Sequence, residues 1–356
     1  MISYNIISLM SGTSLDGIDI AYVQISRNDE NSWEFKLVKA ETFEYTDEMK
    51  ESLSKSTEIS APALFQLNKV LGQTMGDSIN QFISKNKISK GEIQLIASHG
   101  HTVYHQPEKG FTVQIGCGST IALKTGINVV NDFRTKDVIL GGQGAPLVPI
   151  GDFELFKNEA DAFLNIGGIT NISFKEGGKI KAFDCSPGNL PLNKLAQNKG
   201  LNYDKNGEMA RAGEINFFLL DLLNGLPYYQ LTGPKSLGTE WLEQYFYPLV
   251  KFDRDIENNL RTIIEHEAYQ IGQVLNQHEI KSVLITGGGA FNQFLVERIQ
   301  HYYKGKVVLP AKEVIEFKEA IIFAFLGALY LEKSPNCLSE VTGASRDVCG
   351  GVFHRA

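Results

Sequence analysis

The sequence has few cysteines, and they are scattered. Its 356 residues include only Cys117, Cys185, Cys337 and Cys349, and no two of them have the C-x-x-C spacing of common zinc or redox motifs. A disulfide framework or a cysteine zinc site is therefore not expected. The simpler expectation is a protein of a reducing compartment.

Basic clusters and long apolar runs are also absent from the sequence. It has 34 Lys and Arg against 41 Asp and Glu, a net charge of -7, and no Lys/Arg run stands out. This balance argues against nucleic acid or an acidic membrane surface as a partner. The longest apolar run, Ala320–Leu331, is too short to span a bilayer, and the N-terminal MISYNIISLM does not resemble a signal peptide. We therefore expect a soluble, cytoplasmic protein.

What the sequence does contain is a glycine-rich pattern that occurs twice. Asn5–Met10, Gly17–Ile25 and Phe35–Tyr45 read as strands, with a turn of glycine and hydroxyl residues after the first. From about residue 160, AFLNIGGITNISFKEGGKIKAFDCSPGN again reads as strand, glycine turn, strand, hairpin and third strand. Two such units predict a duplicated α/β domain with a cleft between the copies.

Apolar periodicity predicts the longer helices and two further strands. Residues 61–86 and 256–276 carry apolar residues at spacings of three and four, which is typical of amphipathic helices. Leu95–Ser98 and Ser282–Thr286 are short apolar stretches typical of buried strands. Each of these strands runs into a polar or glycine-rich segment that is a candidate for function.

Three glycine turns could bind a nucleotide. Gly12 and Gly17 in the first turn, and the Gly167–Gly168 pair in the second, would let backbone N–H groups approach phosphate without a Cβ in the way. The third, TGGGAFN at 286–292, is a strand–helix junction suited to a nucleoside. Ordinary tight turns explain each cluster as well or better on sequence alone. A dinucleotide enzyme is disfavoured, because no G-x-G-x-x-G motif with a following acidic residue is present.

Asp184, in AFDCSPGN, admits two interpretations. It could cap the helix that Pro187 and Gly188 introduce, or it could be a general base, since an aspartate is ionised at neutral pH. Spacing alone favours the cap.

Two polar segments are candidates for a sugar pocket. His99, His101 and His105 lie in SHGHTVYHQP, where no nearby carboxylate or cysteine completes a metal site, so hydrogen bonding to a sugar or simple surface placement is the better interpretation. Gln143, in GGQGAPLVP, is either a partner for sugar hydroxyls or part of a connecting loop.

Taken together, the motifs resemble one family over almost the whole chain. They occur in the order MSGTSLDGID, SHGHTVYHQP, DFRTKDVILGGQGAPLVP, LNIGGITNIS, FDCSPGN, YDKNG, PKSLGTEW, TGGGAFN, FKEAIIFAFLGAL and SEVTGA. This series resembles the anhydro-N-acetylmuramic acid kinases. The resemblance implies a duplicated actin-like ATPase (ribonuclease H-like) fold, with residues 1–130 and about 320–356 in the first domain and 131–319 in the second.

The resemblance also implies a reaction and its cofactors. The family opens the 1,6-anhydro bridge of anhydro-N-acetylmuramic acid with water and phosphorylates O6 from ATP with Mg²⁺, in peptidoglycan recycling. Asp184 matches the catalytic base. The implied ATP-binding residues are Ser11, Gly12, Thr13, Ser14, Asp16, Gly17, Asp19, Gly167, Gly168, Thr170, Asn171, Gly287, Gly288, Gly289 and Asn292. The implied sugar-binding residues are His99, Arg134, Gln143, Gly144, Ala145, Pro146 and Glu319. No protein ligand for the metal is assigned.

Three departures from the family pattern lie near the pocket segments. His101 stands where glutamine is common, Gln106 where arginine is common, and Cys185–Ser186 replaces a Thr-Gly pair. They bear on the identity of the sugar more than on the fold. The rival hypothesis is a non-catalytic or regulatory protein of the same fold, which would be free to lose Asp184. A serine hydrolase is disfavoured, because neither Ser11 nor Ser186 lies in G-x-S-x-G. A homodimer is compatible with the sequence.

Overall fold

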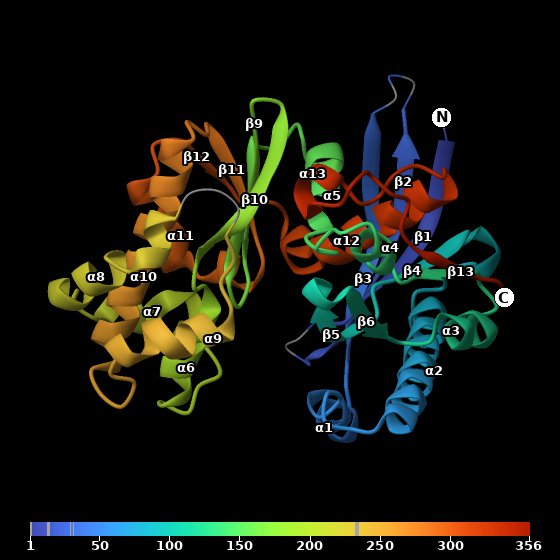
Figure 1. The fold of residues 1–356 in the computed structure, drawn as a ribbon, viewed down its shortest axis with the longest axis horizontal. Helices are drawn as coiled ribbons and strands as arrows, with labels where there is room; N and C mark the ends of the chain where they lie inside the picture. Colours follow the sequence, from blue (N-terminus) through green and yellow to red (C-terminus); the bar gives the residue numbers. More distant parts are fainter. Residues whose placement is uncertain (1, 13–14, 29, 31, 232–234) are drawn as a thin grey trace. The chain divides into compact units, whose positions relative to one another are not determined.

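The chain divides into two compact units in the computed structural model (Figure 1). The structure describes residues 2–12, 15–28, 30, 32–231 and 235–356. Unit 1 comprises Met1–Phe156 and Phe317–Ala356, and unit 2 comprises Lys157–Glu316. Each unit is built around its own sheet and hydrophobic core.

Unit 1 contains a six-stranded sheet in the order β13-β7-β4-β1-β2-β3. Its first three strands are antiparallel neighbours, whereas β4 runs parallel to β1 and β7 runs parallel to β4. The strands are β1 (Ile2–Met10), β2 (Gly17–Arg27), β3 (Trp33–Glu44), β4 (Leu95–Ser98), β7 (Val129–Asn131) and β13 (Val352–His354). A separate hairpin joins β5 (His101–Gln106) to β6 (Phe111–Ile115).

The helices of unit 1 bury their apolar stripes against this sheet. Ser60 caps α2 (Ala61–Lys85) by accepting a hydrogen bond from the Ala63 N–H, and the stripe through Leu71, Met75 and Phe82 is fully buried. The other helices are α1 (Asp47–Ser54), α3 (Gly118–Thr125), α4 (Thr135–Ile139), α5 (Val148–Leu155), α12 (Lys312–Leu331) and α13 (Ser339–Thr342). Most of α12 is buried on all sides, so its apolar run forms core and not a membrane span.

Unit 2 contains a five-stranded sheet in the order β10-β9-β8-β11-β12. Its strands are β8 (Ala162–Ile166), β9 (Thr170–Glu176), β10 (Lys179–Ser186), β11 (Ser282–Thr286) and β12 (Lys306–Val308). Its helices are α6 (Asn189–Gln197), α7 (Glu208–Ala212), α8 (Phe217–Asn224), α9 (Thr239–Trp241), α10 (Ile256–Gln277) and α11 (Gln293–Tyr302). The long helix α10 is buried along Leu260, Ile264, Ile271 and Leu275.

The two sheets have the same topology, which confirms the predicted duplication. In each unit the first three strands are antiparallel, and two parallel strands follow on the far side of the first strand. A long helix precedes the fourth strand of each sheet, and a shorter one precedes the fifth. The chain therefore has the predicted duplicated α/β fold.

The first boundary between the units lies after Phe156 and not at residue 130, and the chain returns to unit 1 at Phe317. Residues 131–156 belong with unit 1, where the Lys318 ammonium lies 2.7 Å from the Asp152 carboxylate and a Cβ on Gly151 would lie 2.6 Å from Ile322. Helix α5 thus packs on α12, a contact between distant segments that local sequence periodicity does not reveal.

Candidate active site

The first glycine turn lies between β1 and β2 in unit 1. Thr13 and Ser14 lie outside the described residues. The buried hydroxyl of Ser11 accepts a hydrogen bond from the Tyr45 hydroxyl at 2.7 Å and lies 3.1 Å from Nδ1 of His101. These two contacts hold the Ser11 side chain in the interior of unit 1. The backbone of Ser11 is the group that remains for a ligand.

The pairing of β2 with β3 explains why glycine is needed at position 17. A Cβ at this position would lie 2.3 Å from the carbonyl oxygen of Phe43, so only glycine allows β2 to pair with β3 at this point. The neighbouring carboxylates differ: Asp19 accepts a hydrogen bond from the Thr42 hydroxyl at 2.5 Å, whereas Asp16 is exposed. Strand pairing thus explains Gly17 without a bound phosphate.

His99, Arg134 and Gly144, three of the residues predicted to bind the sugar, contact one another in unit 1. Nε2 of His99 lies 3.1 Å from Nε and 2.8 Å from Nη2 of Arg134, and Nη1 of Arg134 donates to the Gly144 carbonyl at 2.6 Å. Nδ1 of His99 lies 2.9 Å from the Gly100 carbonyl, so this nitrogen carries the proton and Nε2 accepts from the guanidinium. The arrangement fixes both the tautomer of His99 and the plane of Arg134.

Burial and charge set the protonation of this cluster. Burial, followed by the charge of Arg134, holds the pKa of His99 well below its usual value, so the imidazole is neutral. Burial raises the pKa of Glu319, on α12, while the positive charge of Arg134 opposes that rise. Unit 1 therefore places a cation and a carboxyl group, both half-buried, close enough for the charge of Arg134 to act on Glu319.

Asp137 is a residue of this cluster that the sequence reasoning missed. It is fully buried, and its carboxylate accepts hydrogen bonds from the Gly144 N–H at 2.8 Å and from the Thr342 hydroxyl at 2.7 Å. Thr342 lies in SEVTGA, one of the quoted motifs, and its carbonyl accepts from the Gln143 N–H. The loop is thus fixed from beneath, with the Gln143 and Pro146 side chains exposed and Ala145 half-buried.

The glycine turns of unit 2 converge around the end of β8. The carbonyls of Gly167 and Gly168 accept hydrogen bonds from the first N–H groups of α6, Asn189 at 2.9 Å and Leu190 at 3.1 Å. A Cβ on Gly188, whose φ is +66°, would lie 2.7 Å from the Gly167 carbonyl oxygen.

The third glycine segment packs on the same strand end. A Cβ on Gly287 would lie 2.7 Å from the carbonyl oxygen of Ile166, and one on Gly289 would lie 2.2 Å from the Ile166 side chain. Close backbone approach therefore explains these glycines, and Gly288 remains exposed beside them. The structure brings together the segments 165–168, 187–190 and 287–289, which lie far apart in the sequence.

Three further residues of unit 2 that were predicted to bind the nucleotide differ in their burial and contacts. Thr170 is fully buried, whereas Asn171, its neighbour on β9, is exposed and lies opposite Asp184 in the ladder. Asn292 caps α11 by accepting from the Leu295 N–H at 3.0 Å. A Cβ on Gly207, in YDKNG, would lie 2.4 Å from Oδ1 of Asn292, so that motif joins the same cluster.

Asp184 does not cap the following helix, so that interpretation is wrong. Helix α6 begins after Gly188 and has no side-chain cap. Oδ2 of Asp184 instead accepts a hydrogen bond from the Leu237 N–H at 2.7 Å, and the Asp184 carbonyl accepts from the Tyr228 hydroxyl at 2.8 Å. The cap prediction failed because Asp184 still lies in β10, and its carboxylate binds a distant loop. Burial raises its pKa and the Leu237 N–H opposes that rise.

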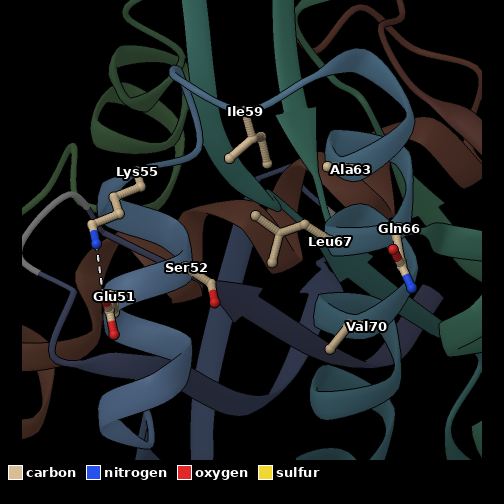
Figure 2. Close-up of a pocket in the computed structure, with 8 residues that line it drawn as sticks. All are labelled: Glu51, Ser52, Lys55, Ile59, Ala63, Gln66, Leu67 and Val70. Carbon is tan, nitrogen blue, oxygen red and sulfur yellow. Dashed lines mark hydrogen bonds and ion pairs between the residues drawn. The ribbon is translucent and has the colours of Figure 1, made fainter.

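A groove of about 430 Å³ lies in unit 1 (Figure 2). It is formed by α1, α2 and the segment between them, and the Lys55 ammonium lies 2.7 Å from the Glu51 carboxylate beside it. Its lining residues are Glu51, Ser52, Lys55, Ile59, Ala63, Gln66, Leu67 and Val70. No predicted site residue lines it.

The described residues contain no preformed metal cluster. No group of three or more His, Cys, Asp or Glu side chains is placed to hold an ion within that part of the chain. Mg²⁺ commonly binds through one or two carboxylates together with substrate phosphates and waters, so Asp16 and Asp19 fit that weaker requirement. Within the same residues, no helix has the length and apolarity needed to cross a membrane.

Comparison with known proteins identifies the family. The model of the family "Anhydro-N-acetylmuramic acid kinase" matches residues 4–356. The chain belongs to this family. It is 35% identical over 366 residues to the anhydro-N-acetylmuramic acid kinase of Legionella pneumophila strain Philadelphia 1, covering 98% of the chain and 97% of the relative. The kinases of the same name from Haemophilus influenzae and Shewanella oneidensis are 35% and 36% identical, each with 98% of the chain covered.

Two of the three departures from the family pattern fill interior positions. His101 is buried against Ser11, and the Cys185 thiol lies 3.5 Å from the carbonyl oxygen of Thr170, with Ser186 fully buried beside it. Gln106 is half-buried and accepts from the Lys109 ammonium at 3.3 Å. His101 and Cys185–Ser186 therefore affect how the turns are supported.

Proposed function

We propose that the chain uses ATP to convert 1,6-anhydro-N-acetylmuramic acid into N-acetylmuramic acid 6-phosphate. The observation that carries this proposal is the family match across residues 4–356, in a chain that retains Asp184. The reaction class is phosphoryl transfer to an alcohol group, coupled to hydrolytic opening of the anhydro ring.

Asp184 is the proposed general base. It accepts a proton from water as the water oxygen bonds to the anomeric carbon. The bond between that carbon and O6 breaks, and O6 takes the γ-phosphoryl group of ATP, which leaves ADP. The hydrogen bond from Leu237 orients the carboxylate, while partial burial raises its pKa and so strengthens it as a proton acceptor.

The remaining residues position the two substrates. We assign the glycine segments around Ile166 in unit 2, together with the backbone of the first turn in unit 1, to ATP. We assign the cluster of His99, Arg134 and Glu319 to the sugar, where the loop 143–146 adds an amide and backbone groups. Positioning and charge neutralisation supply most of the catalysis in phosphoryl transfer. Bound Mg²⁺ would neutralise phosphate charge, and Asp16 or Asp19 would hold it.

The rival proposal is a sugar- or nucleotide-binding protein without activity. It predicts binding of ATP or the anhydro-sugar without turnover. The presence of Asp184 favours the enzyme. A cytoplasmic location fits recycling of cell-wall fragments, and a homodimer is compatible with the proposal; light scattering on the purified chain tests the latter.

Mass spectrometry of the product tests the function. The purified chain is incubated with Mg-ATP and 1,6-anhydro-N-acetylmuramic acid, and we expect a product that has gained one water and one phosphoryl group. In H₂¹⁸O the label should appear at C1. Unchanged sugar would overturn the proposal, and label in the phosphate ester would overturn the route through attack at C1.

A further inference from the structure

Asp184 lies in the outermost strand of the unit 2 sheet. Strand β10 pairs with β9 and is the last strand in the sheet order. At Asp184 the backbone N–H donates to the Lys235 carbonyl at 3.1 Å, and the backbone carbonyl accepts from the Tyr228 hydroxyl at 2.8 Å. Backbone groups at the edge of a sheet have no ladder partner and must be paired in another way. Tyr228 and Lys235 therefore close the sheet edge at the proposed base.

Tyr228 contributes its side chain to this arrangement, whereas Lys235 contributes its backbone carbonyl. Tyr228 is buried, and the centroid of its ring lies 5.5 Å from that of Tyr229 and 5.3 Å from that of Trp241. The Tyr228 carbonyl accepts from the Lys235 ammonium at 3.3 Å. Ring packing and this backbone contact together fix the direction from which the hydroxyl reaches Asp184.

We propose that Tyr228 is a positioning residue for the general base, because its hydroxyl holds the end of β10 where the Asp184 carboxylate contacts the Leu237 N–H. That N–H donates to Oδ2 at 2.7 Å and orients the carboxylate. If the Asp184 carbonyl is released, the carboxylate shifts with the backbone that carries it and loses its alignment with the attacking water. The inference rests on the proposed function for its effect on turnover, since only a base requires this alignment.

Tyr229 provides a matched control one position along the chain. Its hydroxyl lies 2.8 Å from Nε2 of His266, so it contacts α10 and not the end of β10. Tyr228→Phe and Tyr229→Phe remove the same atom from two rings that pack on each other, and phenylalanine keeps that packing, so both variants should fold. Each leaves an acceptor without its donor, and each should lower the melting temperature. A difference in turnover between them therefore reports the place of the hydroxyl and not a loss of stability.

The first measurement is steady-state kinetics over a range of pH. Tyr228→Phe should lower kcat about tenfold, the upper worth of one neutral hydrogen bond, and leave KM for ATP and for the anhydro-sugar within about twofold of wild type. The acid limb of its pH–rate profile should move to higher pH, because a weaker contact with the Leu237 N–H favours the protonated carboxyl group. Tyr229→Phe should keep the wild-type kcat and pH–rate profile.

The second measurement is amide hydrogen exchange, which needs no substrate. In Tyr228→Phe the amides of Asp184 and Leu237 should exchange about tenfold faster than in wild type, and in Tyr229→Phe they should stay within about twofold. Equal exchange at these amides in the two variants would overturn the inference, as would an equal kcat. If the wild-type chain phosphorylates nothing, the proposed function is overturned, and the exchange still decides whether Tyr228 holds Asp184.

Discussion

Arg134 donates to Nε2 of His99 through two of its nitrogens, at 3.1 and 2.8 Å, while Nδ1 of His99 lies against the Gly100 carbonyl. The imidazole is therefore a neutral acceptor that fixes the guanidinium. Burial, followed by the positive charge of Arg134, keeps the pKa of His99 low. His99, a candidate sugar ligand in the sequence, thus supports the side chain of Arg134 in the structure.

This support predicts a selective effect of His99→Ala. Arg134 would lose its acceptor, and a hydrogen bond to a charged group is worth about 1.5–3 kcal/mol, or roughly a 10- to 100-fold change. We expect KM for the anhydro-sugar to rise by that factor and KM for ATP to change little. Steady-state kinetics with each substrate varied in turn is the measurement. A rise confined to KM for ATP would contradict the assignment of this cluster to the sugar.

His266 predicts how stability depends on pH. It is fully buried, its Nε2 lies 2.8 Å from the Tyr229 hydroxyl, and burial lowers its pKa to about 3. Between pH 6.5 and 3 the unfolded chain binds a proton at this site that the folded chain does not bind. Its contribution to stability is therefore complete above pH 6.5 and is lost as the pH falls.

Chemical denaturation of wild type and His266→Gln at pH 7, 6 and 5 measures this term. The free energy of unfolding of wild type should fall relative to the variant by up to about 2 kcal/mol between pH 6.5 and 5. Parallel curves for the two proteins would show that His266 titrates alike in both states.

The glycine turns predict different outcomes for two alanine substitutions. On Gly17 a Cβ would lie 2.3 Å from the Phe43 carbonyl oxygen, so Gly17→Ala should lower the melting temperature together with activity. On Gly167 the nearest atom, the Ile169 carbonyl oxygen, would lie 3.5 Å away. Gly167→Ala should therefore fold normally and raise KM for ATP, about tenfold if one phosphate contact is lost. Calorimetry and kinetics on both variants test this. An unaltered KM in Gly167→Ala would remove the turn from the ATP site.

Local patterns predicted the elements of this fold well. The residues 61–86 and 256–276 form α2 and α10 almost to their ends, and Ser282–Thr286 is strand β11 as predicted. Apolar periodicity records which face of an element is buried, so it transfers directly from sequence to structure. The repeated strand–glycine turn–strand pattern likewise predicted the duplication.

Contacts between distant segments could not be predicted in the same way. Asp184 is a good capping residue by type, but its carboxylate binds the Leu237 N–H, 53 positions along the chain. The packing of Gly188 and Gly287 on the end of β8 depends on where β10, α6 and β11 lie in space. Asp137 gave no signal at all, because its role is to hold a loop whose path only the tertiary structure shows.

Asp184→Asn separates a proton acceptor from a hydrogen-bond acceptor. Asparagine retains an oxygen for the Leu237 N–H, so the loop and the fold should be kept, but it cannot take a proton from water. If Asp184 is the base, turnover should fall by roughly 10²- to 10⁴-fold, while binding of ATP and of the anhydro-sugar persists.

Melting curves, calorimetry with each ligand and steady-state rates on Asp184→Asn are the measurements. Asp161→Asn is the matched control, because Asp161 also accepts a hydrogen bond, from the Ser282 hydroxyl, but lies just before β8, at the end of that strand away from the glycine turns. It should keep near wild-type turnover. Because burial raises the pKa of Asp184, the wild-type rate should fall on acidification through a pKa above the ordinary aspartate value, as the base becomes protonated. A folded, ligand-binding Asp184→Asn with wild-type turnover would mean that some other group takes the proton.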